Sequence, residues 1–404
     1  PKPLRRRQEK ERIVRKLRIS FFGSSLVSAW WNGAATYYRG ILRALHERGH
    51  EITFYEPDAL NRQSHRDIDD PPYARVVVYE ATPHGAQQAV ERAAGSDLVA
   101  KASGVGVLDE LLERAVLALK SPRTMVVFWD VDAPATLERM KANPNDGLRA
   151  LVPQFDAVFT YGGGPGVVRA YAEFGARVCK CIYNALDPST HYPAAPGSAM
   201  CCDVLFVGNR LPDREKRVDE FFIEPARRLP QRQFLLGGNG WDDKQLPFNV
   251  RRLGHVFTAD HNMLNCSAMA VLNIARDSMA RYGYSPATRV FEAAGAGACI
   301  ITDAWEGLNM FLEPGSEILV ARDTEEVISH VRSLNADKAA AIGQAARKHI
   351  LANHCYSHRA VEFEETLRGN FGGESPCPTG CRSLFADYQL RLPGATAMPP
   401  RIAG

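Results

Sequence analysis

The chain has 404 residues, of which 45% are hydrophobic and 24% are charged, and its formal net charge is +3. A chain of this length is expected to form two domains, and its composition is that of an ordinary globular protein. The small net charge gives no reason to expect nucleic acid as a partner. No apolar run reaches the roughly twenty residues that a membrane-spanning helix needs, so we expect no transmembrane segment.

The first half of the chain alternates short apolar runs with helical patterns, after a basic extension over residues 1–16. The expected strands lie at residues 18–23, 51–55, 97–102, 124–129, 157–161 and 178–183. This alternation is typical of a parallel sheet covered by helices, in which ligands bind beyond the carboxyl ends of the strands. The loop after the first strand contains no G-x-G-x-x-G sequence, which argues against a nicotinamide-dependent dehydrogenase.

Three loops that follow these strands carry candidate ligand contacts. Trp30 and Trp31, beside Gly33, suit stacking on a sugar or base, or packing beneath their own loop, and Trp31 and Gly33 are candidates for acceptor or sugar contacts. Asp130 and Asp132, expected at a strand tip that faces the cleft, are candidates for an acceptor base or for contacts to a sugar; the alternative is a turn in which Asp132 caps the next helix. The glycine-rich turn at residues 162–166 brings backbone N–H groups close to a ligand, or only makes a tight turn.

The alternation restarts after a proline-rich linker at residues 184–200. Its expected strands lie at residues 203–208, 233–236, 250–256, 270–276, 299–302 and 317–321. We therefore predict two doubly wound Rossmann-like domains, over residues 17–190 and 191–355, that face each other across a cleft. The Gly/Pro-rich residues 370–404 are expected to be loosely held.

The stretch from Ser285 to Asp303 is the most informative part of the second half. Pro286 is suited to start a helix, and Arg289 and Glu292 lie on neighbouring parts of that helix near its N-terminus. A cation, a carboxylate and free backbone N–H groups at the carboxyl edge of a parallel sheet suit a phosphorylated, hydroxyl-rich ligand. The alternative is a surface ion pair on an ordinary helix.

The cysteines and histidines predict no metal site. Cys377 and Cys381 form a lone pair without a second pair or histidines beside them, and several of the other cysteines are expected in strands as small core residues. His84, His191 and His255 are scattered along the chain and are interpreted as structural. Unpaired cysteines indicate the reducing cytoplasm.

The second half resembles the GT-B glycosyltransferases, and more specifically the CgeB-like glycosyltransferases. The matching residues are 206–209, 214, 272–274, 286, 289–293, 301–303, 307–308, 313–315 and 317–319. The first half adds residues 130–134, 184–188 and 191–193, so that the resemblance extends over about residues 17 to 368.

The resemblance implies that a sugar is transferred from a nucleoside diphosphate donor held mainly by the second domain, to an unknown acceptor. Glu292 would bind the ribose, and Asn273 would belong to the donor site. Arg214 or Arg289, with the backbone around Gly208, would neutralise the departing diphosphate. GT-B enzymes typically need neither metal nor organic cofactor, and their last helix, here residues 356–369, commonly crosses back to the first domain.

One position departs from the family pattern. Related retaining enzymes often have a second glutamate eight residues before the ribose-binding one, and this chain has Tyr284 there, which leaves the stereochemical outcome open. The alternatives are a GT-B nucleotide-sugar epimerase, which needs no acceptor, and a protein that binds a nucleotide sugar without catalysis.

Overall fold

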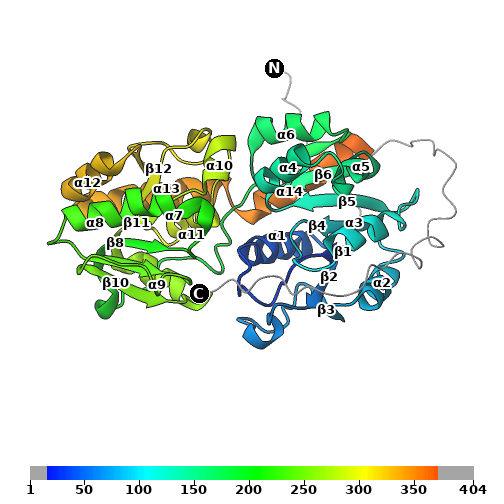
Figure 1. Ribbon diagram of the computed structural model, residues 1–404, viewed down its shortest axis with the longest axis horizontal. Helices are drawn as coiled ribbons and strands as arrows, with labels where there is room; N and C mark the ends of the chain where they lie inside the picture. Colours follow the sequence, from blue (N-terminus) through cyan, green and yellow to red (C-terminus); the bar gives the residue numbers. More distant parts are fainter. Residues whose placement is uncertain (1–15, 372–404) are drawn as a thin grey trace, which may run out of the picture.

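The computed structural model describes residues 16–371, with the side chain of the last of these left out. The predicted basic extension, apart from Lys16, and the predicted tail beyond residue 371 therefore lie outside the described residues, as do Cys377 and Cys381. Two α/β domains lie side by side along the longest axis of the molecule (Figure 1). No helix in the described part is long and apolar enough to span a bilayer.

The first domain is built on a seven-stranded sheet in which all neighbouring strands are parallel. Its strand order is β3 (Arg75–Glu80), β2 (Glu51–Asp58), β1 (Arg18–Phe22), β4 (Leu98–Ala102), β5 (Met125–Asp130), β6 (Ala157–Thr160) and β7 (Cys179–Cys181). The central strands are near-continuous apolar runs because helices cover both of their faces.

Side chains alternate between the two faces of this sheet and therefore contribute to two separate hydrophobic cores, one on each face. Phe21 packs with α1 (Ala35–Glu47) on one face, whereas its neighbour Phe22 lies in the core of the opposite face. That opposite face is covered by α2 (Pro83–Arg92), α3 (Asp109–Leu117), α4 (Ala133–Ala142), α5 (Gly147–Leu151) and α6 (Gly164–Glu173).

The second domain repeats the plan with a six-stranded parallel sheet. Its order is β10 (Val250–Gly254), β9 (Phe234–Gly237), β8 (Cys202–Val207), β11 (Ala268–Asn273), β12 (Ile300–Asp303) and β13 (Leu319–Ala321). Its helices are α7 (Pro212–Val218), α8 (Glu224–Arg228), α9 (His261–Ser267), α10 (Asp277–Tyr282), α11 (Thr288–Gly295), α12 (Thr324–Ser333) and α13 (Ala336–Asn353).

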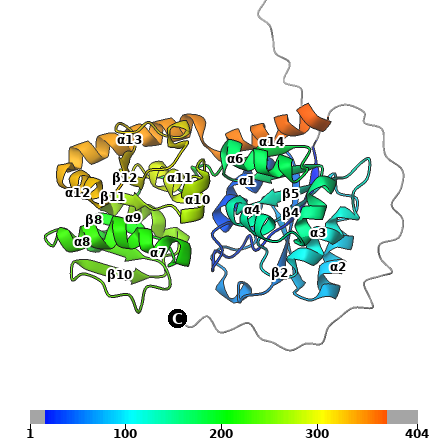
Figure 2. The ribbon, with the colours of Figure 1, turned by 45° about the horizontal axis from the view of Figure 1, so that its top comes forward.

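The last described helix, α14 (Tyr356–Phe371), leaves the second domain and packs on the first (Figure 2). The ring of Tyr356 lies so close to Gly40 in α1 that a Cβ at this glycine would be 2.1 Å from ring carbons. Phe363 packs against Trp129 of the first sheet, with ring centroids 5.4 Å apart. The helix is thus part of the first domain's core.

A polar cluster centred on the buried Glu364 also attaches α14 to the first domain. Glu364 accepts hydrogen bonds from Arg48 at 2.7 Å and lies 3.1 Å from Nε2 of His50. Nδ1 of His50 accepts the backbone N–H of Leu17, so the proton of a neutral ring sits on Nε2 and points at Glu364. Burial would raise the pKa of Glu364, but the hydrogen bonds from Arg48 and His50 outweigh it and lower that pKa.

The predicted fold class, two doubly wound Rossmann-like domains, is confirmed. The sequence analysis missed β3 and α2, because β3 is a half-exposed edge strand that follows a polar, proline-containing stretch. It also missed the short helix α10. Pro286 does not open α11, which begins at Thr288 with Ala287 as its N-cap residue.

Candidate functional site

Two arginines from different helices converge where β8 ends. Arg214 lies in α7 and Arg289 in the first turn of α11. A Cβ at Gly208 would lie 2.9 Å from Nη2 of Arg214 and 3.1 Å from Nη2 of Arg289. Both guanidinium groups also lie over the ring of Phe206, with their central carbons 5.5 and 5.1 Å from its centroid. A larger residue at this position would have to displace the two guanidinium groups from where they lie.

The charges of the two arginines are offset only in part, by Asp303 near both of them, by Asp213 near Arg214 and by Glu292 near Arg289. Neither forms an ion pair with a carboxylate among residues 16–371; Arg214 donates to the carbonyl of Asn209, and Arg289 to the carbonyl of Val207. Burial, and then the charge of Arg289, lower the pKa of Arg214 to about 9, and burial lowers the pKa of Arg289 to about 10. Two close, partly desolvated cations form a site that an anion with several oxygens would stabilise.

Asn273 holds the guanidinium of Arg289 by a hydrogen bond and is itself buried, so it offers no exposed surface to a ligand. Its Oδ1 accepts from Nη1 of Arg289 at 3.2 Å, and its Nδ2 donates to Oγ1 of Thr302 at 3.0 Å. The side chain is almost completely buried at the end of β11. Its place in the structure is that of a positioning residue for Arg289, and the prediction that it contacts a ligand has no support from this geometry.

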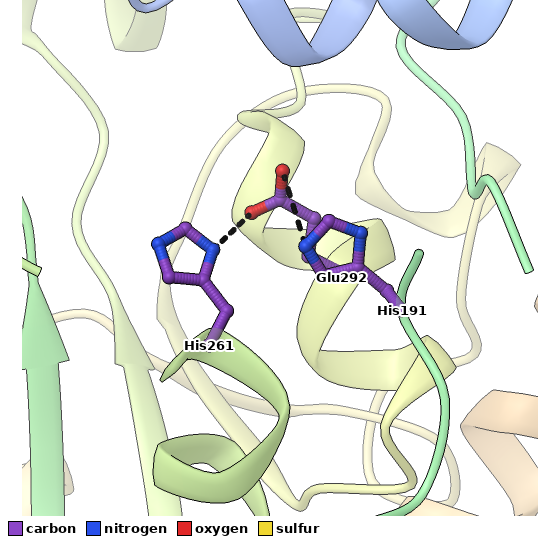
Figure 3. Close-up of side chains that lie close together, drawn as sticks. All are labelled: His191, His261 and Glu292. Carbon is purple, nitrogen blue, oxygen red and sulfur yellow. Dashed lines mark ion pairs between the residues drawn. The ribbon is translucent and has the colours of Figure 1, made fainter. Parts of the chain in front are cut away.

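Glu292, one turn further along α11, lies between two histidines (Figure 3). Its Oε1 is 4.0 Å from Nε2 of His191, and its Oε2 is 3.9 Å from Nδ1 of His261. The carboxylate is only 7% exposed, and no ion pair between it and Arg289 occurs in the described structure. The alternative of a surface ion pair on an ordinary helix is therefore wrong.

These three residues are also the group with metal-ligand chemistry in the described part of the chain. One ligand atom from each of His191, His261 and Glu292 lies within 4.8 Å of the others. The sequence analysis interpreted His191 as one of several scattered, structural histidines, and the structure places it beside Glu292. His261 was missed altogether, since no local pattern around it signals a site.

Asp130 does not face the space between the domains, and that expectation is wrong. Its carboxylate is fully buried and accepts hydrogen bonds from Ser103, Thr136, Tyr171 and the backbone N–H of Asp132. Burial raises the pKa of Asp130 in spite of these bonds. The residue fixes the turn after β5 and is out of reach of any acceptor.

Asp132, in contrast, lies at the junction of the two domains. It occupies the N-cap position of α4, but its side chain makes no capping bond. Instead its Oδ2 is 2.9 Å from Nη1 of Arg276, which follows β11 in the second domain. Arg276 also pairs with Asp213 at 2.8 Å, so one half-buried guanidinium joins the carboxyl edges of both sheets.

The two tryptophans after β1 behave differently from each other. Trp30 stacks on His65 with ring centroids 4.1 Å apart and reaches His255 of the second domain at 5.6 Å. Trp31 is 52% exposed, and a Cβ at Gly33 would meet nothing within 4 Å. Of the two sequence alternatives, packing therefore applies to Trp30, while Trp31 remains free to stack on a ligand.

The glycine-rich turn after β6 docks on the second domain. The backbone N–H of Gly163 donates to the carbonyl of Tyr284 at 2.7 Å, and a Cβ at Gly164 would lie 2.5 Å from the side chain of Tyr284. Tyr284 itself has a φ of 47°, and its hydroxyl is 3.2 Å from Oε1 of Glu306. The N–H of Gly163 is therefore occupied by a domain contact, and the turn serves the junction.

Comparisons with known proteins agree with this architecture. Residues 214–365 match the model of a family described as glycosyl transferase-like. No curated protein matches the sequence.

Solved structures match almost the whole chain at low sequence identity. A sucrose-phosphate synthase from Thermosynechococcus elongatus has a TM-score of 0.67 and 14% identity, with 88% of this chain and 100% of that chain covered. Anabaena HepE in complex with UDP and glucose has a TM-score of 0.64 and 16% identity, with 87% and 100% covered. An α-glucosyltransferase in complex with UDP and a 13-mer DNA has a TM-score of 0.65 and 13% identity, with 87% and 99% covered.

These likenesses show that the chain has the GT-B fold of glycosyltransferases. Its second domain carries the glycosyl transferase-like sequence signature, which includes both arginines of the site and Glu292.

Proposed function

We propose that the protein is a glycosyltransferase of the CgeB-like type, which transfers a sugar from a nucleoside diphosphate donor to an acceptor hydroxyl. The observation that carries this proposal is the convergence of Arg214 and Arg289 over Gly208, where neither arginine forms an ion pair with a carboxylate of the described residues. The matching family model and the UDP complexes among proteins of the same fold support it.

The arginine pair would act on the leaving group. As the bond from the sugar to the diphosphate breaks, negative charge builds up on the phosphate oxygens, and fixed cations in a buried site stabilise that charge with little reorganisation. Two guanidinium groups offer several N–H donors in fixed planes, which suits a diphosphate without help from a metal. We therefore propose that catalysis needs neither metal nor organic cofactor.

Glu292 would hold the ribose of the donor. An ionised carboxylate only accepts hydrogen bonds, so it suits a hydroxyl group of the ribose as its donor. Its position on α11, one turn beyond Arg289, places ribose and diphosphate contacts on the same helix.

The acceptor side of the proposal rests on the first domain. Asp132 is a carboxylate of the first domain that pairs with Arg276 across the junction, and it would take the proton from the acceptor hydroxyl once Arg276 releases it. Trp31, which is exposed beside Gly33, would contact the acceptor or the transferred sugar. We do not expect nucleic acid as the acceptor, although one protein of the same fold is complexed with DNA. We also propose that the protein works in the cytoplasm.

A two-stage assay tests the proposal. A thermal-shift screen against nucleoside diphosphates and their sugars first identifies the donor, since a ligand at a hundred times its Kd stabilises by about 2.7 kcal/mol. The donor is then incubated with and without candidate acceptors. Products are identified by mass spectrometry, and the configuration of the sugar in each product is determined. A new glycoside that forms only with an acceptor is the expected result.

Other outcomes would redirect the proposal. A change of sugar configuration without any acceptor would indicate an epimerase, and binding without turnover on any acceptor would indicate a binding protein. Glu292→Gln should lose donor binding, whereas the matched change Glu325→Gln, in an exposed ion pair with Arg228, should not.

A further inference from the structure

The hydrogen bonds around His191 fix which ring nitrogen carries the proton. Oγ1 of Thr190 donates to the carbonyl of Asp187 at 3.1 Å, so its oxygen is left to accept from Nδ1 of His191 at 3.0 Å. In a neutral ring the proton is then on Nδ1, and Nε2 is an acceptor.

In the neutral ring of His191, the acceptor nitrogen Nε2 faces a second acceptor, the carboxylate of Glu292. Nε2 of His191 is buried, has no hydrogen-bond partner among the described residues, and faces Oε1 of Glu292 at 4.0 Å. The whole histidine is only 2% exposed. A buried polar atom without a partner costs about 1–3 kcal/mol, so the pair calls for a ligand that brings donors to both atoms.

The spacing favours hydroxyl groups over a metal ion. A zinc ion lies about 2.0–2.2 Å from nitrogen and oxygen ligands, so bridging 4.0 Å would need an angle at the metal of roughly 130–180°, far from the tetrahedral value. Two hydroxyl groups on adjacent carbons offer two separate donors, each about 2.7–2.8 Å from its own acceptor.

We propose that His191 completes, with Glu292 and His261, a site that reads the vicinal diol of the donor's ribose. One ribose hydroxyl donates to Glu292 and the other to Nε2 of His191, while Nδ1 of His261 lies 3.9 Å from the second carboxylate oxygen. The inference rests on the proposed function, since it assigns the ribose of the nucleoside diphosphate to this cluster.

The chemistry of the neighbouring groups is consistent with this assignment. Burial lowers the pKa of His261 despite the nearby carboxylate of Glu292, which keeps that ring neutral and able to accept or donate a hydrogen bond to a hydroxyl. The consequence is selectivity: a deoxyribose would leave one buried acceptor unpaired, and sites built to bond a hydroxyl strongly reject analogues that lack it.

Calorimetric titration with matched nucleotides tests the proposal. The probes are the ribonucleoside diphosphates with the four common bases and their 2′-deoxy and 3′-deoxy counterparts, titrated into the full chain. We expect the preferred ribonucleotide to bind at least about tenfold more tightly than both deoxy forms. His191→Phe, which keeps a ring but removes Nε2, should reduce at least one of these ratios to within about twofold, and His84→Phe on the exposed face of α2 should leave both unchanged.

A second variant keeps the test valid if His191→Phe does not fold. Thr190→Val preserves shape but removes the acceptor that holds the Nδ1 proton, so it should also weaken the discrimination while leaving the ring in place. Discrimination that survives in both folded variants would overturn the proposal.

The remaining outcomes separate this inference from the proposed function. Tight binding of ribo and deoxy forms alike by the wild type would overturn the diol site, including the ribose contact of Glu292, and would leave the phosphate site of Arg214 and Arg289 standing. No binding of any nucleoside diphosphate would overturn both. Stoichiometric Zn²⁺ binding that is lost in His191→Phe, with no preference for ribose, would show that the cluster holds a metal and would equally overturn the diol site.

Discussion

Replacing Arg289 by methionine removes one of the two cations over Gly208 while keeping most of the side-chain volume. The change deprives Asn273 Oδ1 and the carbonyl of Val207 of their donor, which costs about 1–3 kcal/mol of stability for a buried acceptor. Relief of the repulsion between Arg289 and Arg214 offsets part of that cost. We therefore expect a folded protein with a modestly lowered melting temperature.

The effect on binding should be larger and specific for phosphate. A charge-assisted hydrogen bond contributes about 1.5–3 kcal/mol, which corresponds to a roughly ten- to hundredfold loss of affinity for the nucleoside diphosphate. The bare nucleoside makes no such bond, so its Kd should change by less than about twofold. Calorimetry on both ligands measures the two changes.

The matched control is Arg251→Met, which removes an exposed arginine of β10 that donates to the carbonyl of Ala199. It should leave both affinities unchanged. Equal losses for nucleoside and nucleoside diphosphate in Arg289→Met would refute the reasoning, because they would mean a damaged fold instead of a lost phosphate contact.

Three further predictions concern the acceptor base, the domain junction and the last helix. Asp132→Asn should lower the turnover number about 10²- to 10⁴-fold and leave the donor affinity within twofold of the wild type. The control Glu138→Gln, in an exposed pair with Arg281, should leave the turnover number unchanged. Unchanged turnover in Asp132→Asn would exclude this residue as the base. Arg276→Met removes the guanidinium that joins Asp132 to the second domain, so small-angle scattering should show a larger radius of gyration without nucleotide and contraction with it; identical curves would speak against domain closure. Because the pKa of Glu364 is lowered in the folded protein, its stabilising effect is complete above the unfolded pKa of about 4.3 and is lost as the pH falls through the lower folded value. Glu364→Gln should therefore reduce the free energy of unfolding at pH 7, and that free energy should decline less steeply between pH 5 and 2 than in the wild type. Parallel stability curves for the two proteins would contradict this.

The parts of the site that the sequence predicted are those set by local pattern. Gly208 follows an apolar strand, and Arg289 and Glu292 share a helix that leads into another strand, so their common place at a carboxyl edge follows from the periodicity alone. The convergence of Arg214 on the same glycine was implied by the resemblance, and it depends on packing against Phe206 that no local pattern encodes.

The parts that the sequence did not predict depend on contacts between distant segments. His191, His261 and Glu292 come from a loop and two helices, and only the packed second domain brings them together. Asp130 looks like an exposed strand tip in the sequence, but Ser103 and Tyr171, far away along the chain, bury and bond its carboxylate. Short-range patterns carry no information on either.

The most direct test of the donor site is a crystal structure of the protein with a bound nucleoside diphosphate. We predict that the diphosphate lies within hydrogen-bond distance of Arg214 and Arg289 beside Gly208, with the ribose against Glu292. A nucleotide bound elsewhere, or one whose phosphates point away from the two arginines, would contradict the account.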